Sequence, residues 1–541
     1  MSQGAKKIAV PSLFIPSGDP YAHIPKRHFY ERLAALIDLS FVRDLTAPFY
    51  AEQIGRPSLD PVVFFKCMLV AYFENITSDR ALEFRLADSL VIRKYLGYGL
   101  EERTPDESTV RKTRHLLPEE VFRLVFMQVL AQCAHRGLVS GRALGMDSTT
   151  VDANASMDSL VHKELGCTYE EFIVALRQHD EPSTTQEAAK RKGSNGETKV
   201  AAKETDASDG NASNAETNDA ATEADTTAPG TARKNVTIDD AKLADKNRIG
   251  KASNADWSSP TDPDARVMQH ADKHTHLSYH LDTTVDLQSG IIVSIGADFA
   301  DQSDQRTCLD RVDEAVENVL AVGGSPQMIV ADKGHHSGEN LRGIAARGLI
   351  PLISSPCQSR GAEGFRRENF SYDQATDSYG CPAGQTLQRQ VNRHDTQLYQ
   401  APGRICRVCP HFGVCTKSKT GRGLSISLDD EIIQENRARV HHPDARPIMM
   451  IRRQRGEAPF GYFKQFGGLR RITGHGVTLA TKKALIAGIA WNLFKIMQVD
   501  SALLPFIAAF LCLLRPIESR WQALDGAWQS KMFKYQSCNI I

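Results

Sequence analysis

The sequence predicts a mixed α/β fold that is joined to a helical N-terminal domain. Two apolar stretches, residues 144–152 and 328–334, each resemble a buried strand that carries one aspartate. A helical pattern covers residues 28–137, and a strongly apolar helix that packs on the sheet is expected at 480–497. Because 541 residues exceed the size of a single core, we expect roughly two to four modules.

Charge and cysteine content limit the classes of function. Lysine and arginine total 65 and aspartate and glutamate total 65, so any nucleic-acid binding has to come from local basic patches. The eleven cysteines are scattered except for one cluster, and no signal peptide precedes them. This pattern favours a reducing, cytoplasmic location. The longest apolar run, residues 502–514, is interrupted by Pro505 and is too short to span a bilayer.

The N-terminal helices are predicted from their capping residues. Asp60 and Pro61 precede a strongly apolar stretch, and a capping carboxylate followed by proline favours the start of a helix. Ser78 or Asp79 is expected to cap the next helix, and Gly137 is expected to end the last one.

A further capped helix start, residues 104–115, displays basic side chains in its first turns. Polar and basic residues at such a position suit a helix that binds a DNA groove or its phosphates. We therefore predict DNA-phosphate contacts from Arg111, Lys112 and Arg114. The alternative interpretation is a solvated helix face.

Composition changes sharply between residues 181 and 254, just after a short helix expected at 169–177. The segment consists mainly of Ala, Thr, Asp, Asn, Lys and Gly, with almost no large apolar side chain. Such a segment buries too little surface to offset the entropy of ordering, so we predict a disordered insertion.

The order of elements after the insertion indicates the type of α/β core. Residues 278–286 and 291–297 are predicted to form a hairpin around the turn 287–290. Residues 304–321 have helical periodicity, and the strand that carries Asp332 follows. Strand, hairpin, helix and strand is the order of a ribonuclease-H-like core, although other mixed sheets share it.

Asp147 and Asp332 are the first candidate metal ligands. A carboxylate in a buried strand is costly unless a partner such as a metal ion compensates its charge. Two strands that each carry an aspartate therefore predict an oxygen-ligand site for Mg²⁺ at the edge of an α/β sheet. Asp152 lies five residues beyond Asp147 in the same strand and is expected to face the other side of the sheet.

The third candidate acid, Glu457, lies in the region where basic residues concentrate. Arg453 and Lys464 share its face if the segment is helical. Because a proline inside a helix kinks or ends it, Pro459 predicts that the helix either begins near Glu457 or bends there. The alternative is an exposed, salt-bridged helix.

The cysteine cluster lies in a polar, turn-rich stretch and consists of Cys381, Cys406, Cys409 and Cys415. A C-x₂-C pair with two further thiols predicts a structural Zn²⁺ site. The alternative is four unpaired thiols.

Three ordered blocks resemble bacterial insertion-sequence transposases of the DDE type, in the group with a Tyr-x₂-Arg-x₃-Glu-x₆-Lys signature. Arg453, Glu457 and Lys464 fit the last three positions, whereas Met450 occupies the tyrosine position. The tyrosine's DNA contact is therefore not carried over.

The other blocks cover the remaining acids and the N-terminal helices. Residues 146–156 are similar to the first-aspartate block of this family, and residues 331–337 to the second. Residues 55–59 and 104–114 resemble the helical domain that accompanies these enzymes.

The resemblance implies a metal-dependent DNA transposase with Asp147, Asp332 and Glu457 as its metal-binding triad. Two Mg²⁺ or Mn²⁺ ions about 3.5–4 Å apart would activate water or a 3′-hydroxyl and stabilise the leaving oxygen. The implied partners are the double-stranded DNA of the element ends and the target. Arg453 and Lys464 would hold phosphates, while His335 and His336 are interpreted as structural.

The implied reaction is nicking at the element ends followed by transfer of the 3′-OH strand into target DNA. Because two ends are handled together, we expect a homodimer. Two alternatives remain, an end-binding protein that no longer cuts and a ribonuclease-H-like nuclease without strand transfer. The presence of all three acids favours the active enzyme.

The sequence predicts the following parts: an N-terminal arm (1–27), a helical DNA-binding domain (28–140), the first part of the core (141–356) with its insertion (181–254), a cysteine-containing insertion (357–430), the third-acid and packing helices (431–500) and a C-terminal tail (501–541).

Overall fold

The computed structural model describes residues 21–50, 58–177, 254–269, 274–356, 364–390 and 396–500. The chain divides into two compact units, Met1–Ser156 with Thr261–Ile541 and Met157–Pro260. The predictions for residues 1–20, 55–57, 181–253 and 501–541 lie outside the described residues. Within the described ranges, no helix is both long enough and apolar enough to cross a membrane.

The N-terminal part of the larger unit is helical, as predicted. Asp60 accepts a hydrogen bond from the amide of Val62 at 2.9 Å, and Pro61 occupies the first turn of the following helix. Ser78 caps the next helix, and Gly137, with φ of +71°, follows the last. The elements are α1 (Phe29–Leu36), α2 (Phe41–Thr46), η1 (Ala47–Phe49), α3 (Pro61–Phe73), α4 (Asp79–Asp88), α5 (Leu90–Leu96), α6 (Glu107–Leu116) and α7 (Glu119–His135).

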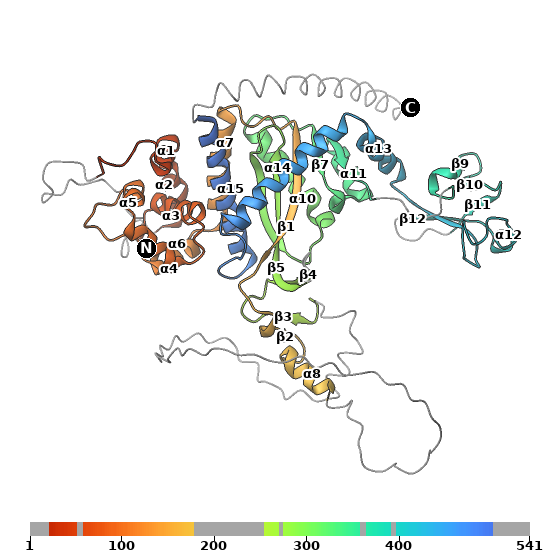
Figure 1. Ribbon diagram of the computed structural model, residues 1–541, viewed down its shortest axis with the longest axis horizontal. Helices are drawn as coiled ribbons and strands as arrows, with labels where there is room; N and C mark the ends of the chain where they lie inside the picture. The colour runs from red at the N-terminus through yellow and green to blue at the C-terminus, as the bar shows by residue number, and fades with distance from the viewer. Residues whose placement is uncertain are drawn as a thin grey trace, which may run out of the picture. The chain divides into compact units, whose positions relative to one another are not determined.

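A six-stranded mixed sheet lies at the centre of the larger unit (Figure 1). Its strands are β1 (Ala143–Asp152), β4 (Arg266–Gln269), β5 (Thr275–Asp286), β6 (Ile292–Phe299), β7 (Met328–Ala331) and β8 (Ile350–Ile353). The order is β4-β5-β1-β7-β8, and β6 pairs with β5. Strands β1, β7 and β8 are parallel, whereas β5 is antiparallel to β1, β4 and β6. The predicted hairpin is therefore β5–β6.

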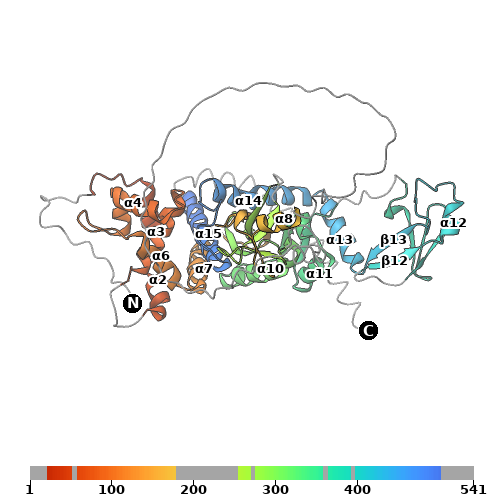
Figure 2. The ribbon, with the colours of Figure 1, turned by 90° about the horizontal axis from the view of Figure 1, so that it is seen from below.

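Helices cover both faces of this sheet. Figure 2 shows α14 (Ala445–Gln465) on one side of the strands and α10 (Asp304–Ala321) with α11 (Gly338–Ala346) on the other. Because successive side chains of a strand point to opposite faces, Asp147 of β1 meets α14, whereas Ser148 meets α10. The bounds of α10 agree with the predicted helix at 304–321.

Pro459 left two alternatives, a helix that begins near Glu457 and a helix that bends there. The structure excludes the first. Helix α14 begins twelve residues earlier, at Ala445, and continues through Pro459 to Gln465. Pro459 and Phe463 are buried, so tertiary packing holds the helix together where local sequence alone would end it.

Two buried asparagines bond to the backbone of two outer strands, β8 and β6. At β8, Asn436 of α13 (Asp430–His441) accepts from the amide of Ile353 at 3.0 Å and donates to its carbonyl at 2.7 Å. Next to β6, Asn492 of α15 (Val477–Asp500) makes the same two bonds with Ile292, at 2.9 and 2.8 Å. These amides satisfy backbone groups that an edge strand would leave open.

The smaller unit contains η2 (Met157–Ser159), β2 (Val161–His162), α8 (Tyr169–Arg177) and β3 (Trp257–Ser258) among its described residues. Strands β2 and β3 pair antiparallel. The rings of Phe172 and Trp257 pack edge to face, with centroids 5.5 Å apart. This unit therefore has an aromatic core of its own.

A second, five-stranded antiparallel sheet follows β8 in the chain, in the order β13-β12-β11-β10-β9. We refer to its described residues, 364–390 and 396–427, as the cysteine module. Its elements are η4 (Arg367–Asn369), β9 (Ser371–Asp373), β10 (Ser378–Gly380), β11 (Thr386–Arg389), β12 (Thr396–Gln400), α12 (Gly403–Arg407) and β13 (Gly423–Ser427).

Candidate active site

Asp147 lies in the middle of β1, the strand that pairs with both β5 and β7. Its side chain is 13% exposed, and its Oδ1 lies 2.8 Å from Nη2 of Arg452 on α14. The Arg452 guanidinium also donates to the carbonyl oxygen of Met146, at 3.1 and 2.8 Å. A buried arginine thus fixes both the strand and the carboxylate.

The pKa of Asp147 indicates which other acids lie near it. Burial raises this pKa, the Arg452 guanidinium lowers it, and the negative charges of Asp332 and Glu457 raise it further. The net pKa lies above the ordinary value of an aspartate. The carboxylates of Asp332 and Glu457 therefore contribute to the electrostatic environment of Asp147.

Asp332 directly follows β7, so its carboxylate lies at the end of the strand that runs parallel to β1. Its Oδ1 accepts from the amide of Gly334 and from Nδ1 of the buried His335, each at 2.9 Å. The hydrogen bond from His335 is the largest cause that lowers the pKa of Asp332 to about 2. This carboxylate is held ionised and in a fixed orientation.

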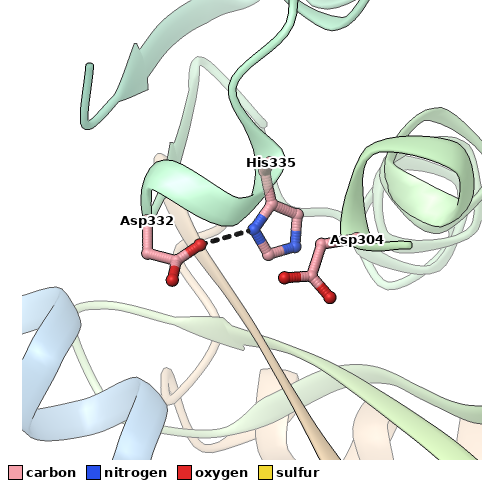
Figure 3. Close-up of side chains that lie close together, drawn as sticks. All are labelled: Asp304, Asp332 and His335. Atoms are coloured by element: carbon pink, nitrogen blue, oxygen red, sulfur yellow. Dashed lines mark hydrogen bonds and ion pairs between the residues drawn. The ribbon is translucent and has the colours of Figure 1, made fainter. Parts of the chain in front are cut away.

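Asp304, the first residue of α10, lies beside Asp332 and His335 (Figure 3). One potential ligand atom from each of the three lies within 4.8 Å of the others. Ser148 donates to Oδ1 of Asp304 at 2.7 Å, and Nε2 of His280 lies 3.3 Å from the same oxygen. Among the described residues, this is the group that has ligand spacing for a metal ion.

Gly334 permits this close arrangement. A Cβ atom at this position would overlap Oδ2 of Asp304 and lie 3.1 Å from Oδ1 of Asp332. Any larger residue would therefore displace one of the two carboxylates.

Glu457 is exposed on α14, one residue beyond the buried Gly456. A Cβ at Gly456 would lie 3.5 Å from Oδ2 of Asp147, so the helix passes directly beside that carboxylate. Glu457 is near enough to raise the pKa of Asp147, but it does not belong to the group that has ligand spacing. The side chain of Asp147 is turned toward Arg452, and that of Asp332 toward His335.

The basic residues of the predicted signature lie in two different environments. Arg453 is exposed. Lys464 donates from Nζ to Oγ1 of Thr149, also on β1, at 2.6 Å. Burial lowers the pKa of Lys464, while the charge of Asp152 raises it.

One of the three predicted phosphate contacts on α6 is wrong. Arg111 and Lys112 are exposed, but Arg114 is buried and donates to both carboxylate oxygens of Asp79 on α4, at 3.0 and 2.6 Å. The buried guanidinium joins two helices through its two terminal nitrogens, which are therefore not free to bind a DNA phosphate.

The four clustered cysteines converge in the cysteine module. Cys381, Cys406, Cys409 and Cys415 line one pocket, and all four are free thiols of intermediate exposure.

Sequence reasoning missed Asp304, Arg452 and His280. Asp304 follows Ser303, and in the sequence it indicated only the start of a helix. Arg452 precedes Gly456 by four residues, a spacing that puts both on one helix face. In the sequence, an arginine and a glycine on the same helix face were the pattern that could have indicated the close approach of α14 to β1.

The donor set fits a hard divalent cation. Carboxylate oxygens suit Mg²⁺ and Mn²⁺, and Asp304 and Asp332 supply them within the group that has ligand spacing, to which Asp147 and Glu457 do not belong. Like charges at this separation repel one another, and a bound cation would relieve that repulsion.

Comparison with known families gives two matches. Residues 19–116 match a family described as "Transposase domain (DUF772)". Residues 380–497 match one described as "Transposase DDE domain", a range that includes the cysteine module from β11 onward, α14 and most of α15. No match was found among curated proteins. The chain therefore contains one stretch similar to a transposase domain and one stretch similar to a DDE transposase domain.

Proposed function

We propose that this chain nicks DNA at the ends of a mobile element and transfers the resulting 3′-OH strand into target DNA, with Asp147, Asp332 and Glu457 as its catalytic acids. One observation carries the proposal. Asp332 directly follows the strand that runs parallel to the strand of Asp147, and Gly456, the residue before Glu457, lies so close that a Cβ atom there would be 3.5 Å from Oδ2 of Asp147. The matches to two transposase domains support the same reaction class.

The strand order supports a ribonuclease-H-like core. Read across the sheet, β6, β5, β1, β7 and β8 are neighbours, and β5 runs antiparallel to β1 while β7 runs parallel. The first acid then lies in the central strand and the second at the end of its parallel neighbour.

Asp147, Asp332 and Glu457 would hold two Mg²⁺ or Mn²⁺ ions, with Asp304 as a further carboxylate beside Asp332. When bound, such ions supply a water or 3′-hydroxyl activated for attack and a stabilised leaving oxygen. The protein's own contribution is orientation. Arg452 holds Asp147, and His335 holds Asp332, through the contacts described above.

Basic side chains would bind the DNA backbone. The exposed Arg453 lies four residues from Glu457 on α14, and the half-buried Lys464 lies at the C-terminal end of the same helix. Arg111 and Lys112 on α6 offer a second set of phosphate contacts. We expect a homodimer to act, since the two element ends must be cut and joined together.

The test is a cleavage and joining assay on DNA that carries the element ends. We expect Mg²⁺-dependent nicks and joined products, and we expect Asp147→Asn, Asp332→Asn and Glu457→Gln each to abolish both while end binding persists. Asp310→Asn is the matched control, because Asp310 is exposed on the same helix as Asp304.

Three outcomes would contradict the proposal. End binding without Mg²⁺-dependent nicking would indicate an end-binding protein. Nicking without joined products would indicate a nuclease. Excision retained by Asp332→Asn in a plasmid assay would remove that residue from the site.

A further inference from the structure

The cysteine module has little apolar core of its own. Seven buried residues form its core cluster: Phe370, Tyr379, Leu387, Tyr399, Ala401, Leu424 and Ile426. Cys381, Cys406 and Cys415 pack against this cluster and are partly buried. A sheet of this size buries too little apolar surface for independent stability, and small domains of this kind commonly depend on a metal ion or a disulfide.

The four cysteines come from two tight segments at the same end of the sheet. Cys381 directly follows β10 and begins a turn that reaches Gly384, whose φ is +76°. Cys406 lies in α12, and Cys409 and Cys415 follow within nine residues. Two ligand-bearing segments that line the same pocket form a common arrangement for structural zinc.

The four thiols lie close together, because all of them line one pocket with Leu387 and Ala401. In the absence of a cation, their thiolate forms would repel one another.

Backbone amides donate to two of the sulfur atoms. The amide of Gln385 lies 3.3 Å from Sγ of Cys381, and the amide of Arg422 lies 3.4 Å from Sγ of Cys406. Sulfur is only a weak acceptor. Once a cation is bound, the same two amides would donate to ligating sulfur atoms and hold them in place.

His411 also lines the pocket, but its ring packs against Phe365, with centroids 5.0 Å apart. Four cysteines already complete a tetrahedral sulfur set, and soft thiolates select zinc over magnesium or manganese. The sulfur atoms are not yet at ligand spacing, so binding would draw them together.

We propose that Cys381, Cys406, Cys409 and Cys415 bind one structural Zn²⁺ ion that stabilises the cysteine module. Each thiol loses its proton on binding, so the site forms without an oxidant or reductant. This site is separate from the carboxylates of β1, β7 and α14 and uses a different metal. The proposal does not depend on the DNA reaction.

The first test is metal content and spectroscopy of the full chain, purified under reducing conditions. We expect about one zinc per chain. After exchange with Co²⁺, we expect intense thiolate-to-cobalt charge-transfer bands, which an oxygen-ligand site does not produce. Because this measurement uses the unaltered protein, it holds even if variants fail to fold.

The second test is substitution. Cys409→Ser and Cys381→Ser should each lower the bound zinc at least tenfold and reduce the resistance of the module to proteolysis. Cys133→Ala is the matched control, because Cys133 is a buried thiol on α7 and should leave the zinc content unchanged.

Several results would overturn the proposal. These are protein without zinc and without cobalt–thiolate bands, a disulfide between any two of the four cysteines under reducing conditions, or zinc that persists in both serine variants.

Discussion

Replacing Arg452 with methionine should destabilise the strand that carries Asp147. The guanidinium is buried and donates to both Asp147 and the carbonyl of Met146. Removing one partner of a buried ion pair leaves the other charge uncompensated, at a cost of about 3–5 kcal/mol. Because Asp147 is only 13% exposed, solvent screening reduces this cost little.

Arg453 provides the matched control. It is the next residue on α14 but is exposed, so Arg453→Met should change stability by no more than about 0.5 kcal/mol. Urea denaturation of both variants gives the difference in free energy. Hydrogen exchange of the β1 amides then reports whether the loss is local to that strand, as expected for Arg452→Met.

A double-mutant cycle separates the ion pair from packing. In an Asp147→Asn background the carboxylate charge is absent, so Arg452→Met should cost about 1–3 kcal/mol less than in the wild-type chain. Additive effects, within about 0.5 kcal/mol, would refute the claim that Arg452 acts through the charge of Asp147.

Three further predictions follow from individual contacts. Arg114→Met should lower the free energy of unfolding by about 3–5 kcal/mol. Arg111→Ala should leave that free energy unchanged and should reduce the slope of log affinity for DNA against log salt concentration by about 0.9. Equal losses of stability in the two variants would contradict the assignment of Arg114 to the structure and of Arg111 to DNA. Gly334→Ala should displace Asp304 and raise the Mg²⁺ concentration for half-maximal nicking at least about tenfold, and an unchanged requirement would exclude Asp304 from the site. Burial lowers the pKa of Lys483 to about 7, below its value in the unfolded chain. The free energy of unfolding of the wild-type chain should therefore rise with pH above about 7, and Lys483→Met should flatten that rise. The same pH dependence of stability in the wild-type chain and the variant would disprove this prediction.

Local features of the fold could be predicted from the sequence. The capping pair of Asp60 and Pro61, the turn of the β5–β6 hairpin and the helix 304–321 depend on residues close to one another in the chain. The structure confirms each of them.

Contacts between distant residues could not be predicted in the same way. Arg114 is one example, because its partner Asp79 lies 35 residues away and only the folded chain shows the pair. Asp304 is another, since nothing near it in the sequence indicates that α10 begins beside Asp332. Helix α14 passes through Pro459 because buried packing outweighs local helix propensity.

The two asparagines at the sheet edges, Asn436 and Asn492, lie on either side of Glu457 in the sequence. During synthesis, strands β1 to β8 emerge first and expose open edges that are prone to pair with other chains. The segment that supplies both asparagines also carries Glu457. A polypeptide interrupted before this segment would therefore leave backbone groups of β8 and β6 open and would also lack Glu457.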